Sequence, residues 1–232
     1  MSDNVHSGHR KRVRQEFLEH GFNEKTPPHK ILEMLLFYSI PRRDTNVIAH
    51  NLLNKFGSIN GVLDAPSDEL MKIDGVTENT VALFKLILPV SSAYFSDKVA
   101  KNNKFTSSDS MGEFIKAKYI GFTKEVLAIT SLNANGGFLG FDIVSEGDST
   151  AVELSFRKVI ETVMKRNASY VVISHNHPKA NALPSQSDVE LTKRIASLLS
   201  SINVQLIDHI IIGFDDYVSM AQSREYVNIF KS

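Results

Sequence analysis

The chain has 232 residues, 42% of them hydrophobic, which is enough apolar material for two modest cores. Its 26 Lys and Arg residues balance 26 Asp and Glu residues, and zero net charge argues against the diffuse attraction to phosphate seen in basic nucleic-acid binders. The absence of cysteine excludes disulfides and thiolate ligands, so a metal site must use histidine and carboxylate. The sequence has no apolar stretch of about 18 residues and no apolar leader. We therefore expect a cytoplasmic protein without a membrane span.

Residues 1–96 are predicted to form a helical domain. Apolar residues recur there at helical spacing from about Val13 to Tyr94. This spacing places the apolar side chains of each helix on one face, where they can pack into a shared core. Residues 9–14 are basic, and we interpret them as a solvated helix face rather than as a phosphate contact.

The segment 70–81 resembles a helix-hairpin-helix, in which the N–H groups of a tight glycine turn can bind a phosphate. Gly75 fits this pattern, but Thr77 occupies the second glycine position. Asp74 and Glu78 would repel a phosphate at this turn. We therefore favour a structural or protein-docking hairpin, with weak DNA contact as the alternative.

A second candidate for DNA contact is the loop that holds Arg42 and Arg43. It lies between two predicted helices, and Asp44 or Thr45 can cap the second helix. Two adjacent guanidinium groups can bind phosphate oxygens, although arginines in such a loop also serve ordinary surface solubility. The loop is thus a stronger phosphate candidate than the hairpin.

Residues 97–110 are rich in lysine, asparagine and serine and interrupt the apolar periodicity, which predicts a linker. Residues 111–232 then alternate between helical and strand-like patterns. Helices are expected near 111–119 and 155–165 and from 189 onward, and strands at 125–132, 138–145, 170–173, 204–212 and 217–221. This alternation predicts an α/β (α+β) fold with a mixed sheet flanked by helices.

Metal-ligand chemistry is concentrated around two histidines. His175 and His177 follow the apolar run 170–173, and side chains two residues apart on a strand point to the same side. Two such imidazoles can hold one metal ion. Asp188 would be the third ligand, brought back by the loop 178–184, which holds a proline at each end. Three protein ligands of this kind leave one tetrahedral position open, as in catalytic zinc sites.

Ser185 and Asp188 also fit the start of a helix. The spacing Ser-x-x-Asp before an apolar-periodic run is typical of a capping box. Both roles are compatible, because Ser185 can begin the helix while Asp188, in its first turn, points its carboxylate towards the histidines.

The strings His175-Asn176-His177-Pro178 and Pro184-Ser185-Gln186-Ser187-Asp188 resemble the JAMM metalloprotease motif of JAB, or MPN-type, domains. In this form the motif is similar to that of the bacterial RadC family. Gly147, Arg157 and the segment Asp208–Gly213 resemble further positions of that family, so the resemblance covers nearly the whole chain. It implies a helical helix-hairpin-helix-like domain followed by a mixed-sheet JAB/MPN domain of cytidine-deaminase-like fold.

Two departures from the family pattern stand out. Lys179-Ala180 follows the motif where many members have Ser-Gly or Gly-Gly, which stiffens the loop over the metal. Phe156 and Lys158 flank Arg157 in place of proline and glutamate, at a predicted helix start. Neither departure removes a ligand.

The resemblance implies a Zn²⁺ cofactor held by the two histidines and Asp188. It also implies a water-activating glutamate on an earlier strand. Ser185 would donate a hydrogen bond to the oxyanion that develops on the substrate, or would serve only as the N-cap.

Glu125 is the predicted general base. It begins the strand-like run 125–132, which is where the family fold places its glutamate. Glu153 and Glu146 are the alternatives, since both lie nearer the histidines in sequence. His209, inside the apolar run 207–212, is interpreted as a structural residue or as one that supports a ligand from behind.

Two functions remain open at this point. The first is a zinc-dependent peptidase or isopeptidase acting on a protein or peptide substrate, with the helical domain docked to a partner. The second is a DNA-associated module, as the family's DNA-repair label implies, in which the helical domain binds DNA and the metal domain is accessory. An intact ligand set favours the first, and the zero net charge counts against the second. Neither substrate identity nor oligomeric state follows from the sequence.

Overall fold

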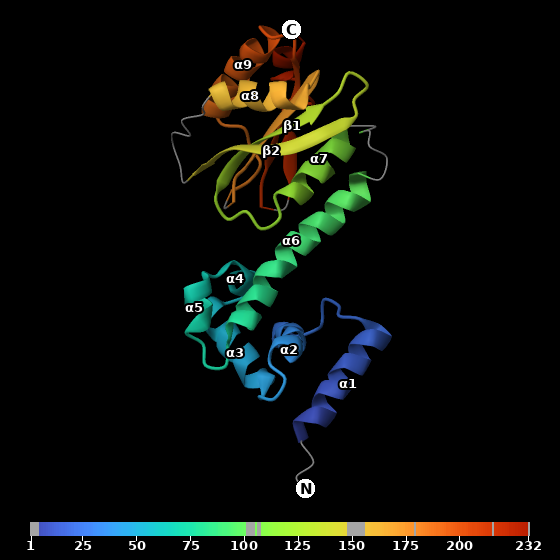
Figure 1. The fold of residues 1–232 in the computed structure, drawn as a ribbon, viewed down its shortest axis with the longest axis vertical. Helices are drawn as coiled ribbons and strands as arrows, with labels where there is room; N and C mark the ends of the chain where they lie inside the picture. The colour runs from blue at the N-terminus through green and yellow to red at the C-terminus, as the bar shows by residue number, and fades with distance from the viewer. Residues whose placement is uncertain are drawn as a thin grey trace. The chain divides into compact units, whose positions relative to one another are not determined.

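The computed structural model describes residues 5–100, 105, 108–147, 156–178, 180–214 and 216–231. The chain divides into two compact units, Met1–Val90 and Ser91–Ser232. Helices build the first unit, and a sheet with helices builds the second (Figure 1). This arrangement confirms the predicted fold class. Within the described residues no helix combines the length and the apolar character that crossing a membrane requires.

The N-terminal unit is built from helices. They are α1 (Val5–His20), α2 (Pro28–Ser39), α3 (Thr45–Phe56), α4 (Ile59–Asp64) and α5 (Ser67–Met71), and α6 (Glu78–Ala100) begins here and continues into the second unit. Helices α2 to α6 share one core, and α1 packs separately through Val13 against Met34 and Phe37 of α2. The apolar faces predicted from the sequence meet in the shared core, where Leu32, Leu52 and Phe84 are fully buried. Asp44 caps α3, since its side chain accepts a hydrogen bond from the Asn46 N–H.

The hairpin segment joins α5 to α6 through Gly75, whose φ is +90°. This left-handed conformation strains any residue with a Cβ atom and therefore favours glycine, and the ends of the Ile48 and Arg43 side chains lie close to the position that a Cβ atom would take. Arg43 Nη2 donates to Asp74 Oδ2 at 3.0 Å. One of the two arginines proposed for DNA contact is therefore paired with Asp74, one of the two acidic residues of the hairpin. DNA contact through Arg42, Arg43 and the hairpin stays a prediction.

The C-terminal unit is a five-stranded mixed sheet with helices. After α6 its elements are α7 (Ser108–Lys118), β1 (Glu125–Leu132), β2 (Phe138–Gly147), α8 (Phe156–Arg166), β3 (Tyr170–Asn176), α9 (Gln186–Ser200), β4 (Gln205–Ile212), β5 (Tyr217–Ser219) and the short 3₁₀ helix η1 (Val227–Phe230). The strand order is β2-β1-β3-β4-β5, with β3 and β4 parallel and the other neighbours antiparallel. The mixed sheet is thus as predicted. The predicted linker, residues 97–110, includes residues outside the described ranges, and a domain division there stays a prediction.

The strands bury a different set of side chains on each face of the sheet. On one face Leu127, Ile173 and Ile211 pack with residues of α8 and α9. On the other face Val126 and Ile210 pack with residues of α7. Figure 1 shows α8 and α9 on the side of the sheet opposite α7. Because side chains alternate along a strand, residues two positions from Leu127 or Ile173 lie on the α8–α9 face.

Candidate metal centre

His175 and His177 stand at the carboxyl end of β3. His175 lies two residues after Ile173, so its side chain is on the α8–α9 face. His177 follows the strand, and its N–H donates to the Ile212 carbonyl at 2.7 Å, which continues the β3–β4 ladder by one residue. The Nε2 atoms of the two histidines lie 2.9 Å apart. The two imidazoles therefore meet at one point.

Asp188 reaches the histidines from the first turn of α9. Ser185 is the N-cap of this helix, and the two residues form the predicted capping box. Asp188 Oδ2 accepts from the Ser185 N–H at 2.7 Å and from the Ser185 hydroxyl at 2.6 Å. Asp188 Oδ1 lies 3.2 Å from His175 Nε2. Oδ1 thus faces His175, while Oδ2 holds the helix start and lies 4.0 Å from His177 Nε2.

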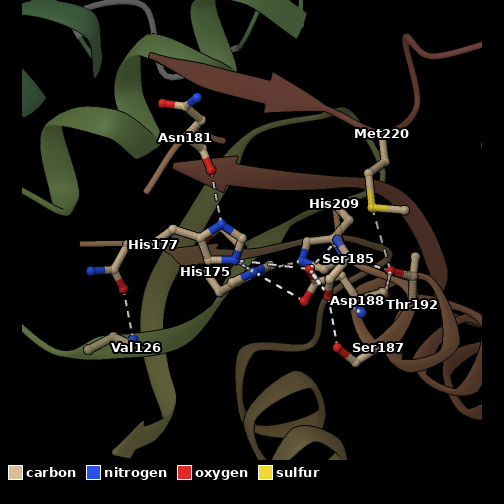
Figure 2. A network of polar contacts seen from close by, with 12 residues as sticks. Val126, His175, His177, Asn181, Ser185, Ser187, Asp188, Thr192, His209 and Met220 are labelled. Carbon is tan, nitrogen blue, oxygen red and sulfur yellow. Dashed lines mark hydrogen bonds and ion pairs between the residues drawn. The ribbon is translucent and has the colours of Figure 1, made fainter. Parts of the chain in front are cut away.

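The loop after β3 folds back onto His177. The Nδ1 atom of His177 lies 3.1 Å from the Asn181 carbonyl oxygen (Figure 2). Because a carbonyl only accepts, His177 carries a proton on Nδ1, and a neutral ring then keeps its lone pair on Nε2. The Phe214 N–H donates to the Ala180 carbonyl at 3.2 Å and ties the loop to the β4–β5 turn. Lys179, expected to stiffen this loop, lies outside the described residues.

His209 and Thr192 lie on the Nδ1 side of the His175 ring, away from His177 (Figure 2). His209 Nε2 is 2.8 Å from His175 Nδ1, and His209 Nδ1 is 2.6 Å from Thr192 Oγ1. His209 and Thr192 have no exposed surface. The contact with His175 fits the second interpretation of His209, in which it holds a ligand histidine in place. The sequence reasoning missed Thr192, although it stands one helical turn after Asp188, a spacing that puts both residues on one face of α9.

His175, His177 and Asp188 each offer one ligand atom, and these atoms lie within 4.8 Å of one another. Burial lowers the pKa of His175 to about 4, against the raising effect of the Asp188 charge. His175 is therefore neutral at pH 7, and its contact with Asp188 is not an ion pair. Neutral imidazoles and a carboxylate are ordinary metal ligands. The side chains of the three residues are 11%, 17% and 13% exposed, so a metal ion could bind here and remain reachable from solvent.

Glu125, the predicted base, is the first residue of β1. The antiparallel register sets Leu127 opposite His175, and continuing it outward by two residues on each strand sets Glu125 opposite His177. Alternation also puts Glu125 on the face of Leu127 and His175. Asn176 lies between the two histidines in the sequence, and its side chain is buried. This side chain accepts from the Val126 N–H at 2.7 Å and donates to the Lys124 carbonyl at 2.9 Å. Its amide thus fixes the backbone on both sides of Glu125.

Glu146 and Glu153 are the alternative bases. Glu146 is exposed on β2 and pairs with Val126. Cross-strand partners share a face, so Glu146 points to the α7 side, away from His175. Glu153 lies outside the described residues. Glu125 is therefore the better placed of the two described candidates, and its role as the base stays a prediction.

A family model and several known proteins are similar to this chain. Residues 105–226 match the family model described as a RadC-like JAB domain. A UPF0758 protein of Fusobacterium nucleatum subsp. nucleatum is 35% identical over 230 residues, which cover 96% of this chain and 98% of the relative. UPF0758 proteins of Ruegeria pomeroyi and Alteromonas mediterranea are 31% and 28% identical, over 88% and 91% of this chain and 91% and 93% of their own lengths. The chain therefore belongs to the RadC family, and a RadC-like JAB domain carries its His175, His177 and Asp188 cluster.

Proposed function

We propose that this protein is a zinc-dependent hydrolase that cleaves a peptide or isopeptide bond in a protein or peptide substrate. The observation that carries the proposal is the convergence of His175 Nε2, His177 Nε2 and Asp188 Oδ1. All three atoms offer lone pairs when both histidines carry their protons on Nδ1. Lone pairs at such short separations repel one another unless a cation lies among them.

The donor set fits zinc. Two imidazoles and one carboxylate are a common ligand set of catalytic zinc sites, and three protein ligands leave a tetrahedral position for water or substrate. A site for Mg²⁺ or Ca²⁺ would be built mainly from oxygen ligands. When bound, zinc would supply the Lewis acidity that lowers the pKa of a water molecule far below its bulk value, to about 7.

Glu125 would act as general base and then as general acid in this reaction. It would accept the proton of the attacking water and return it to the leaving amine, a role that contributes about 10²–10⁴-fold in rate. Two observations support the assignment: the continued register sets Glu125 across from His177, and the Asn176 amide holds the adjoining backbone.

Ser185 would donate a hydrogen bond to the negative charge that develops on the substrate carbonyl oxygen. Its hydroxyl donates to Asp188 Oδ2 when no substrate is present, and the Ser187 hydroxyl lies 2.8 Å away. To donate to the substrate, the Ser185 hydroxyl must therefore rotate and give up its hydrogen bond to Asp188 Oδ2. The Ser185 N–H still holds Asp188 Oδ2 after this change, so the helix start is kept.

Metal analysis of the purified protein tests the site. We expect about one zinc per chain in the wild type and much less in His177→Ala and Asp188→Ala, because each variant removes one of the three ligands. Equal and negligible zinc in all three proteins contradicts the metal centre.

Cleavage of a mixed library of peptides and lysine-linked isopeptides, followed by mass spectrometry, tests the reaction. We expect Glu125→Gln to keep its zinc and to lose activity by about 100-fold or more. Glu146→Gln is the matched control, since Glu146 is a neighbouring strand glutamate on the opposite face, and it should stay active. Zinc binding without cleavage of any peptide or isopeptide contradicts the proposed reaction but not the metal centre.

A further inference from the structure

A chain of buried hydrogen bonds starts at Asp188 and returns to the same metal centre. The Thr192 hydroxyl is 2.5 Å from the Asp188 carbonyl oxygen and 2.6 Å from His209 Nδ1. His209 Nε2 is 2.8 Å from His175 Nδ1, and His175 Nε2 faces Asp188 Oδ1 at 3.2 Å. We propose that Thr192 and His209 are positioning residues that fix the tautomer and orientation of His175 and thereby set the metal affinity of the site. The inference rests on the proposed metal centre.

Thr192 determines the direction in which this series of hydrogen bonds donates, because its hydroxyl has one proton to give. The Asp188 carbonyl can only accept, and a separation of 2.5 Å between two oxygen atoms requires a proton between them. The sulfur of Met220, at 3.7 Å, is a long and weak alternative acceptor. Thr192 therefore donates to Asp188 and accepts from His209 Nδ1–H.

The remaining protons follow from this first one. A neutral His209 that carries its proton on Nδ1 has a lone pair on Nε2, which accepts from His175 Nδ1–H. His175 then has its own lone pair on Nε2, directed at His177 Nε2 and Asp188 Oδ1. A metal ligand needs this tautomer.

The opposite direction would prevent metal binding. If Thr192 donated to His209, then His209 would donate to His175, and His175 Nε2–H would point at Asp188 Oδ1. That arrangement places a proton where the metal would bind. It also leaves Thr192 Oγ1 and the Asp188 carbonyl oxygen 2.5 Å apart with no proton between them, which is strongly repulsive.

Because Thr192 and His209 are buried, the orientation of His175 depends on these two side chains. Thr192 and His209 have no exposed surface, so water cannot easily take the place of a lost partner. One turn of α9 supplies both the Asp188 carboxylate and the Thr192 hydroxyl, and the parallel register of β3 and β4 brings His209 beside His175. Residues that hold a metal-bound histidine in this way typically change metal affinity about 10–100-fold when mutated.

The test compares zinc affinity in Thr192→Val, Thr192→Ser and wild type by competition with a chromophoric chelator. Valine keeps the shape of threonine but has no hydroxyl, and serine keeps the hydroxyl. Thr130→Val is the matched control, because Thr130 is fully buried in β1 and no hydrogen bond is recorded for its hydroxyl among the described residues. We expect about 10–100-fold weaker zinc binding in Thr192→Val alone, with Thr192→Ser and Thr130→Val close to wild type. Equal affinity in Thr192→Val and wild type refutes the inference and leaves the metal centre intact.

A second measurement needs neither metal binding nor a folded variant. Long-range ¹H–¹⁵N spectra of the chelator-treated wild type distinguish the two neutral tautomers of each histidine. We expect His175 and His209 to carry their protons on Nδ1. A proton on Nε2 of either ring overturns the inference, even if the wild type proves to bind no zinc and the proposed function fails.

Discussion

Replacing Asn176 with alanine should destabilise the C-terminal unit by about 2–3 kcal/mol. The Asn176 side chain is buried, accepts from the Val126 N–H and donates to the Lys124 carbonyl. Val126 is 1% exposed, so its N–H would be left buried without this acceptor, at a cost of about 1–3 kcal/mol. Lys124 is exposed, and water can replace the bond to its carbonyl, so that loss should cost about 1 kcal/mol or less.

Urea unfolding followed by circular dichroism measures the loss of stability, and amide hydrogen exchange of Val126 locates it. Asn228→Ala is the control, since Asn228 is exposed on η1, and it should change stability by less than about 0.5 kcal/mol. If Asn176→Ala is as stable as Asn228→Ala and Val126 exchanges as slowly as in the wild type, the Asn176 amide does not hold the start of β1. Under the proposed function, the same substitution should reduce turnover while leaving zinc content near that of the wild type, because it frees the backbone beside Glu125 and removes none of the three proposed ligands.

Three further outcomes are expected. Thr130→Val should stabilise the protein by about 1 kcal/mol in urea unfolding, because it removes a buried hydroxyl for which no partner is recorded in the described residues; a loss of stability would count against this reasoning. In the presence of chelator, stability should fall between pH 7 and pH 5 by about 2 kcal/mol more in the wild type than in His175→Asn. The sign follows from the pKa of His175, which is lowered to about 4: the unfolded chain takes up a proton below about pH 6.5 that the folded chain refuses, and parallel pH profiles would contradict this. Binding to duplex DNA should show no salt-dependent affinity, because the net charge is zero and Arg43 is paired with Asp74; an affinity that weakens steadily with added salt would restore the DNA-associated alternative.

Local spacing explains how much of the site could be predicted. The capping box needed only Ser185 and Asp188 on one short segment, and the helix that follows formed where the apolar period indicated. The two histidines needed only the alternation of one strand. The sheet itself was predictable because its strands carry short apolar runs between turn residues, such as 126–129 in β1, 170–173 in β3 and 210–212 in β4.

Long-range pairing explains what the sequence could not determine. His209 is 34 residues from His175, and only the parallel register of β3 and β4 brings the two rings within hydrogen-bond distance. The hydroxyl of Thr192 reaches hydrogen-bond distance of His209 because α9 packs over that face of the sheet. Neither contact has a signature in local periodicity, because register and packing depend on which strands and helices meet.

By itself, the sequence determined the residue types of the candidate metal centre, the absence of thiolate ligands and the segments that carry the two histidines and Asp188. Only the tertiary structure decided how the polar atoms divide their roles. It assigned Asp188 Oδ2 to the helix start and Asp188 Oδ1 to His175, and it directed the Asn176 amide to the backbone beside Glu125. The physical reason is that hydrogen bonds depend on distances of a few tenths of an ångström, which only the packed chain sets.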